Sequence, residues 1–137
     1  MDVTVDWFGI ALATFAAMAI GSIWYGPLFG DRWMKLVGLK KKDAEADWQK
    51  PMLVMLVMAF VQAIVLAHVI TFAGDYAGDL GATRGLITGF WLWLGIAVPA
   101  IVGNNMFARR DDSLSLIEAG NSLVTLLVMG AILGYML

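Results

Sequence analysis

The chain has 137 residues, of which 61% are hydrophobic, and its mean hydropathy is +0.79. A soluble domain is nearer half apolar. Such a large excess of hydrophobic residues in a short chain indicates a membrane protein. The absence of cysteine excludes disulfides, a thiolate nucleophile and a cysteine metal site. Because there is also a single histidine, we predict no metal and no cofactor. The net charge is only −2, and the segregation of charges along the chain is more informative than their sum.

Four apolar segments reach the roughly 20 residues that a helix needs to cross a bilayer. They cover about 5–25, 51–73, 85–108 and 114–137. Helices are the expected form because lipid offers the backbone no hydrogen-bonding partners, and the segments lack the period-two alternation of membrane strands. We therefore predict an all-α, polytopic membrane protein, a single domain of residues 1–137 with four transmembrane helices in an antiparallel bundle.

Basic residues give the orientation of these segments. Six lie in the loop 26–50, and Arg109 and Arg110 lie between the last two segments, so eight of the nine fall on one side. The positive-inside rule makes that side cytoplasmic. We expect loops 26–50 and 109–113 in the cytoplasm and both termini on the outer face. The basic run 40–42 fits this rule alone, and attraction to anionic lipid headgroups is the alternative.

An aromatic joint opens the first loop. Gly26 and Pro27 predict a helix stop, because glycine tolerates a left-handed cap and proline cannot continue the hydrogen-bond ladder. Trp24, Tyr25 and Trp33 flank this stop, as aromatic rings do at a membrane–water boundary.

A short amphipathic helix is expected directly after the joint. Asp31 is a candidate N-cap, and Gly38 a candidate end. The apolar side of this helix comprises Trp33, Met34, Leu36 and Val37. We predict that it lies on the inner membrane surface, between spans one and two.

Small residues recur every four positions in three of the spans. Such ladders let helix backbones approach closely in a bilayer. They do not say whether a ladder faces its own chain or another copy. Four helices enclose little space, so a pathway would form most easily between copies, and self-association is a reasonable hypothesis. The ladders are Gly9, Ala13, Ala17 and Gly21; Ala59, Ala63 and Ala67; and Gly130 and Gly134.

Polar residues inside the last two spans are the main functional candidates, because such groups are costly in hydrocarbon. Glu118, Asn121 and Thr125 lie on one helical face of the fourth span, and Glu118 is about one turn inside its cytoplasmic end. Asn104 and Asn105 fall at the same depth on the third span. A carboxyl group with amide neighbours there could bind a cation or carry a proton. The alternative is that Glu118 is a hydrogen-bonded packing residue close to the headgroups.

Five further residues invite a functional interpretation. His68, with Gln62 nearer the midplane, could relay protons or hold a ligand. The alternative is a satisfied packing histidine, and no second ligand at helical spacing supports a metal site. Pro99 predicts a kink in the third span, because it frees the carbonyl of Gly95. Trp91 and Trp93 are most simply an outer aromatic belt, and an aromatic box for an organic cation is the alternative.

The chain resembles the DUF1761 family of small bacterial membrane proteins. The resemblance rests on Gly21-Ser22-Ile23-Trp24-Tyr25-Gly26-Pro27-Leu28-Phe29-Gly30, on Trp91-Leu92-Trp93-Leu94-Gly95 with Pro99, and on Gly130-Ala131-Ile132-Leu133-Gly134. It implies a four-helix protein of the bacterial inner membrane. It implies no activity, because the family has no known function.

Two functional hypotheses follow from these residues. The first is a homo-oligomeric helical bundle with a transport or channel-like role. The alternative is a structural or accessory subunit of a larger membrane complex. We predict that the protein is not an enzyme, because no nucleophile–base pair and no phosphate-binding loop is present. The expected partners are the lipid bilayer and copies of the chain or other membrane subunits, and nucleic acid is not among them.

Overall fold

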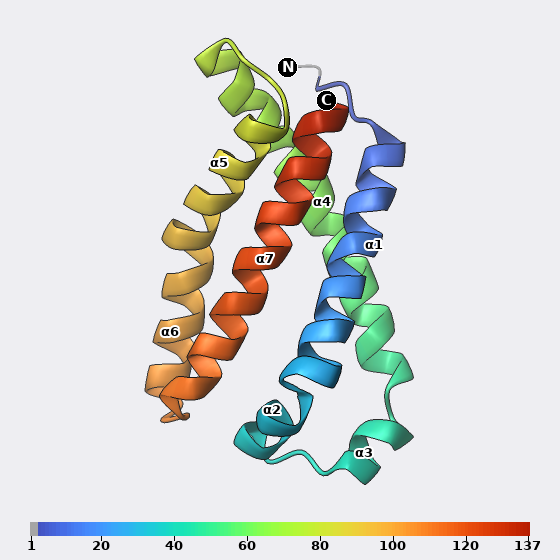
Figure 1. The fold of residues 1–137 in the computed structure, drawn as a ribbon, viewed down its shortest axis with the longest axis vertical. Helices are drawn as coiled ribbons and strands as arrows, with labels where there is room; N and C mark the ends of the chain where they lie inside the picture. Colours follow the sequence, from blue (N-terminus) through green and yellow to red (C-terminus); the bar gives the residue numbers. More distant parts are fainter. Residues whose placement is uncertain (1–2) are drawn as a thin grey trace.

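The computed structural model describes residues 3–137, and every element assigned within them is helical. Four long helical segments lie side by side, each running opposite to the one before it (Figure 1). They are α1 (Trp7–Ile23) continued by the π-helical turn η1 (Trp24–Leu28); α4 (Gln49–Ala77); α5 (Ala82–Leu92), η2 (Trp93–Ala97) and α6 (Val98–Phe107); and α7 (Asp112–Met136). Two short helices, α2 (Gly30–Val37) and α3 (Lys41–Ala46), join the first segment to the second.

All four long segments have the length and composition to cross a membrane. They cover Trp7–Leu28, Gln49–Ala77, Ala82–Phe107 and Asp112–Met136, and an apolar stretch of 18 residues within each has a mean hydropathy of 1.6, 2.6, 1.9 and 1.8, respectively. The largest difference from the predicted bounds is in the second segment. The apolar run ends at residue 73, but the helix continues to Gly78, which closes it with a left-handed φ of 75°.

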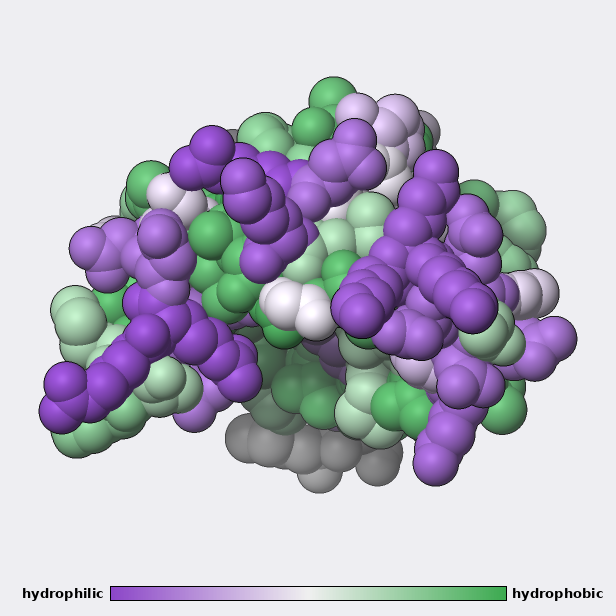
Figure 2. Space-filling model, turned by 90° about the horizontal axis from the view of Figure 1, so that it is seen from below, coloured by the Kyte–Doolittle hydropathy of each residue, from purple (hydrophilic) through white to green (hydrophobic). Residues whose placement is uncertain are grey.

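Charged side chains gather at one end of the molecule, which we call the basic end. It carries α2, α3 and the turn between α6 and α7, and the start of α1 and the C-terminus lie at the opposite end (Figure 1). Seen from this side, hydrophilic side chains cover much of the surface (Figure 2). The long segments between the two ends expose large apolar side chains such as Phe15, Leu53 and Ile96, at 67%, 63% and 66%. A solvated protein would bury most of these, so the surface is suited to lipid.

The aromatic joint differs from its prediction in two respects. Gly26 is not left-handed, and the helix does not stop at Pro27 but continues as the π turn to Leu28. The N–H of Phe29 donates to the carbonyl of Trp24 at 2.9 Å, five residues back, so the wider turn accommodates the proline ring. The chain changes direction only at Phe29.

Helix α2 spans Gly30–Val37 and ends at Gly38, which has a φ of 73°. The predicted cap is wrong: Phe29 occupies the N-cap without a side-chain hydrogen bond, and Asp31 lies in the first turn. A carboxylate there still interacts favourably with the helix dipole, which explains why the sequence pattern resembled a cap.

The core is organised around α7, which packs against α1, α4, α5 and α6. The most completely buried apolar side chains come from three helices, α1, α4 and α7. They include Ile10, Leu66, Ile70, Met129 and Leu133. Helix α5 contributes mainly through its backbone, at the glycine contacts described next.

Glycines bring α5 and α7 into backbone contact. A Cβ on Gly85 would collide with the carbonyl oxygen of Gly130, and one on Gly130 with that of Gly85. A Cβ on Gly89 would lie 2.5 Å from the carbonyl oxygen of Leu126. Such approach is the way in which membrane helices gain packing energy without a hydrophobic driving force between them.

The small-residue ladders therefore serve contacts within the chain. Gly130 contacts α5, and Ala59, Ala63 and Ala67 are buried on the inner side of α4. In the first span the ladder is used only in part, because a Cβ at Gly21 would meet nothing within 4 Å. The sequence left open whether these ladders face their own chain or a second copy. In the structure, the ladders of α4 and α7 face their own chain.

Candidate functional site

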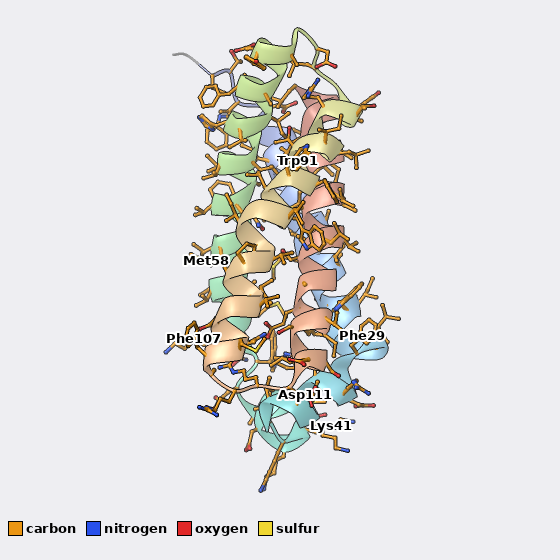
Figure 3. The ribbon with its side chains drawn as sticks, turned by 90° about the vertical axis from the view of Figure 1, so that its left-hand side faces the viewer. Phe29, Lys41, Met58, Trp91, Phe107 and Asp111 are labelled. Carbon is orange, nitrogen blue, oxygen red and sulfur yellow. The ribbon has the colours of Figure 1, made fainter. Side chains whose placement is uncertain are left out.

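The first turn of α7 is fixed to α2 at the basic end. The Asp111 carboxylate caps the helix by accepting the N–H of Ser113 at 2.8 Å, and Arg32 donates to the Ser113 hydroxyl at 3.0 Å. Asp111 lies at the same end as Phe29, the residue before α2 (Figure 3). The hydrogen bonds from Ser113, with the nearby Arg32 charge, hold the pKa of Asp111 below its ordinary value of 3.8. This cap sets where α7 begins and hence the depth of its polar residues.

Asn105 is the centre of a buried polar cluster between α6 and α7. Its side chain is 2% exposed. Its amide nitrogen donates to Glu118 Oε2 at 3.0 Å and to the Ser115 hydroxyl at 3.1 Å. Arg110 donates to the amide oxygen at 3.3 Å. Because the arginine is a pure donor, it fixes the amide orientation so that the NH₂ group faces the carboxylate.

Two more polar atoms continue this face of α7 toward the middle of the molecule. Asn121 and Thr125 follow Glu118 at i+3 and i+7, on the same side of the helix. The Asn121 Oδ1 and Thr125 Oγ1 atoms are buried and have no hydrogen-bonding partner among the described residues. An unpaired buried polar atom costs about 1–3 kcal/mol, so this row favours a bound water or cation.

Trp24 contacts α7 beside this row. It is the first residue of η1, and its indole Nε1–H donates to the carbonyl of Ile117 at 2.9 Å. The ring lies against Gly120, where a Cβ would be 2.8 Å from Trp24 Cζ2. The glycine therefore leaves the space that the indole occupies.

Trp93 makes a similar contact with α7, two residues further along that helix. It is the first residue of η2, and its Nε1–H donates to the carbonyl of Ala119 at 2.8 Å. The N–H of Val98 bonds to the carbonyl of Trp93, five residues back, just before Pro99. The indole N–H of Trp93 is therefore used inside the protein, whereas the belt interpretation would direct it toward the headgroups. Trp91, two residues earlier, is 63% exposed.

Together the two indoles hold the residues on either side of Glu118. Neither contact was predicted from the sequence. The available signal was that each span with an internal proline carries a tryptophan shortly before it, Trp24 before Pro27 and Trp93 before Pro99. Proline disturbs the helical ladder, and a π turn is one way of absorbing the disturbance.

A surface groove reaches the edge of the polar cluster at Ser115. It has a volume of about 460 Å³ and runs between α6 and α7. Ser115, which accepts a hydrogen bond from Asn105, lies on its wall. The other lining residues are Trp93, Val98, Val102, Met106, Asp112, Leu116 and Ala119.

The remaining predicted residues lie outside the cluster. Asn104 is exposed on α6 and does not join Asn105. His68 Nδ1 lies 2.7 Å from the carbonyl of Ile64 on its own helix, a contact that fits the packing alternative. Gln62 is exposed on α4. Residues 3–137 contain no group of three His, Cys, Asp or Glu that could hold a metal ion.

The aromatic residues of the joint pack on one another. Tyr25 and Trp33 meet edge to face with ring centroids 5.2 Å apart, and Trp24 and Phe29 meet at 5.0 Å. These pairs connect η1 to α2 and so fix the direction in which α2 leaves the first span.

This fold and this site define a small multi-pass helical membrane protein with a polar cluster between two of its spans. The chain belongs to the DUF1761 family, described as a protein of unknown function, whose model matches residues 8–134. No curated protein and no solved structure shows significant similarity to it.

Proposed function

We propose that the protein is a homo-oligomer of the bacterial inner membrane in which the Glu118 face of α7 conducts a small cation or protons, a transport or channel-like role. The observation that carries this proposal is the row of oxygen atoms along that face. Glu118 offers a carboxylate, and Asn121 and Thr125 offer buried oxygens without partners. Oxygen ligands of this kind suit hard cations and hydrogen-bonded water.

Glu118 keeps acceptor capacity after its contact with Asn105. A carboxylate has about four acceptor sites, and the described residues fill one of them. The Arg110–Asn105 contact directs a neutral donor, not an ion pair, at the carboxylate. The negative charge of Glu118 therefore remains available to attract a cation or a proton from the basic end.

Self-association supplies what one copy lacks. Beyond Thr125 the same face continues with Met129, which is fully buried. A pathway that starts at Glu118 would therefore have to leave this face before Met129, and we propose that it continues along a surface shared with another copy. We further propose that the four spans form an antiparallel bundle, that α2 lies on the cytoplasmic surface, and that both termini are outside, because the basic residues gather at the α2 end.

Ion flux into liposomes tests the proposal. The purified protein should pass protons or a monovalent cation, and Glu118→Gln should reduce that flux at least tenfold. Glu45→Gln is the matched control, since it makes the same change at an exposed carboxylate of α3, at the same end of the molecule, and should leave flux within twofold. Equal flux in the native chain and Glu118→Gln, or no flux in either, would rule out a conducting role for this face.

The accessory-subunit hypothesis is the second candidate. It is favoured by residues 51–58 of α4, all of which are exposed on every side of the helix. Purification from native membranes distinguishes the two candidates. A second membrane protein present in fixed ratio would support the accessory role, and the chain alone would support self-association.

A further inference from the structure

Gln62 is an amide that the chain leaves without a partner in the middle of an apolar span. It lies 13 residues into α4, is exposed, and makes no hydrogen bond to another residue in the range 3–137. An unsatisfied amide in hydrocarbon is costly, and glutamines in membrane helices commonly bond to a neighbouring helix. The position therefore calls for a partner outside the chain.

The residues around Gln62 form a continuous seam along α4. The seam comprises Met55, Met58, Gln62, Val65, Val69 and Phe72, of which Val69 is half-buried. These residues follow one another at alternating spacings of three and four, the heptad pattern of two helices that pack at a small angle. Figure 3 shows Met58 pointing away from the other helices. The flanking members are exposed, with Met55 at 56%, Met58 at 50%, Val65 at 56% and Phe72 at 43%.

This seam is separate from the face that packs within the chain. The buried positions of α4 include Ala59, Ala63, Leu66, Ala67 and Ile70. At about 100° per residue, their mean direction is roughly 90° from Gln62. The helix thus has one seam for its own chain and a second one, with a polar residue at its centre, that is unoccupied.

We propose that this seam, which we call the Gln62 seam, is where a second copy of the chain binds, through parallel pairing of the two α4 helices. Copies inserted in the same orientation are related by a two-fold axis along the membrane normal, so each residue on the axis meets itself. Glutamine suits that position because its amide both donates and accepts, so two copies can bond reciprocally. This proposal adds to the proposed function the surface through which the copies meet. It rests on that function only in taking the protein to be an oligomer.

Single-cysteine cross-linking tests the seam, since the natural chain has no cysteine. Gln62→Cys in native membranes should form a disulfide-linked species of twice the 14.9 kDa chain mass. Phe60→Cys is the matched control, because it lies within one turn of the same depth but about 160° around the helix. Cross-linking at Phe60→Cys but not Gln62→Cys would overturn the seam.

A binding measurement separates a seam that stabilises the dimer from one that only lies near it. Gln62→Leu should weaken self-association in lipid by roughly eightfold to 300-fold, the range expected for the two reciprocal interhelical hydrogen bonds in a membrane. Asn104→Leu removes another exposed amide and should leave association unchanged. A dimer of undiminished strength in Gln62→Leu would refute the pairing of the two amides.

The outcomes distinguish this inference from the proposed function. Cross-linking through Gln62→Cys without ion flux would support the seam and refute conduction. Flux that depends on Glu118 in a chain that stays monomeric would support conduction and refute the seam. Capture of a different membrane protein at Gln62→Cys would also refute the second copy as the occupant, in favour of the accessory role.

Discussion

Gly120→Ala tests whether the indole of Trp24 is held against α7 as the structure shows. The new Cβ would lie 2.8 Å from Trp24 Cζ2, whereas ordinary contacts begin at 3.4 Å. The ring must therefore retreat by about 0.6 Å, the difference between these two distances. A retreat of that size along the Nε1–H direction takes the 2.9 Å bond to Ile117 beyond hydrogen-bonding range.

The expected loss of stability is the balance of three terms. Overpacking costs about 1–3 kcal/mol, and the lost hydrogen bond about 0.6–1.7 kcal/mol in a membrane protein. Replacement of a helical glycine by alanine returns roughly 0.5–1 kcal/mol. Gly120→Ala should therefore lower the free energy of unfolding by about 1–4 kcal/mol, as measured by titration of mixed micelles with a denaturing detergent.

A double-mutant cycle with Trp24→Phe gives the decisive comparison. Phenylalanine has no atoms at the Cζ2 and Cη2 positions of the indole, so Gly120→Ala should be nearly neutral or stabilising in that background. The control is Gly103→Ala, where a Cβ meets nothing within 4 Å. If Gly120→Ala costs the same with tryptophan or phenylalanine at position 24, the indole is not held where the structure places it.

Three further changes test other parts of the structure. Gly89→Ala should cost about 1–3 kcal/mol in the same titration, because its Cβ would lie 2.5 Å from the Leu126 carbonyl oxygen; no loss would refute the close contact of α5 and α7. Asn105→Leu should lower both the ion flux and the stability relative to the native chain, because Glu118 loses its hydrogen-bond donor. Unchanged flux would refute the role of the polar cluster in conduction. Because the pKa of Asp111 is depressed in the folded state, its contribution to stability is present above pH 3.8 and is lost as the pH falls through the folded pKa. Asp111→Asn should therefore make the free energy of unfolding depend less on pH in the acid range. Identical pH dependence in the native chain and the variant would refute this.

The spans and the family were predictable from the sequence because both depend on long, regular features. Apolar length alone locates four spanning segments, and the family motif around Trp24 is continuous in the chain. The left-handed glycine that ends α2 was likewise predictable, since Gly38 follows an amphipathic turn. Each of these signals is local or compositional.

The prediction at Pro27 was wrong because proline allows more than one solution. A proline removes one donor and crowds the carbonyl four residues back, which the chain relieves either by stopping or by widening the turn. The choice depends on what the displaced residues contact. Here the π turn places Trp24 on α7, a contact 93 residues apart in sequence that no local pattern records.

The polar cluster was predictable only in part for a similar reason. Helical spacing placed Glu118, Asn121 and Thr125 on one face, which depends on a single helix. Whether Asn104 or Asn105 meets that face depends on how α6 is rotated, and adjacent residues differ by about 100°. The π turn η2, which lies just before α6, changes that rotation, so the sequence could not choose between the two asparagines.

The two π turns together position Glu118. The carbonyls of Ile117 and Ala119 already accept bonds within α7, and a second lone pair on each lets an indole bind without breaking the helix. The residue between them therefore has fixed points on both sides, each attached to a proline-containing span. A shift of either span against α7 would move the Glu118 carboxylate relative to Asn105, so the proposed conducting group is positioned by the same turns that the prolines create.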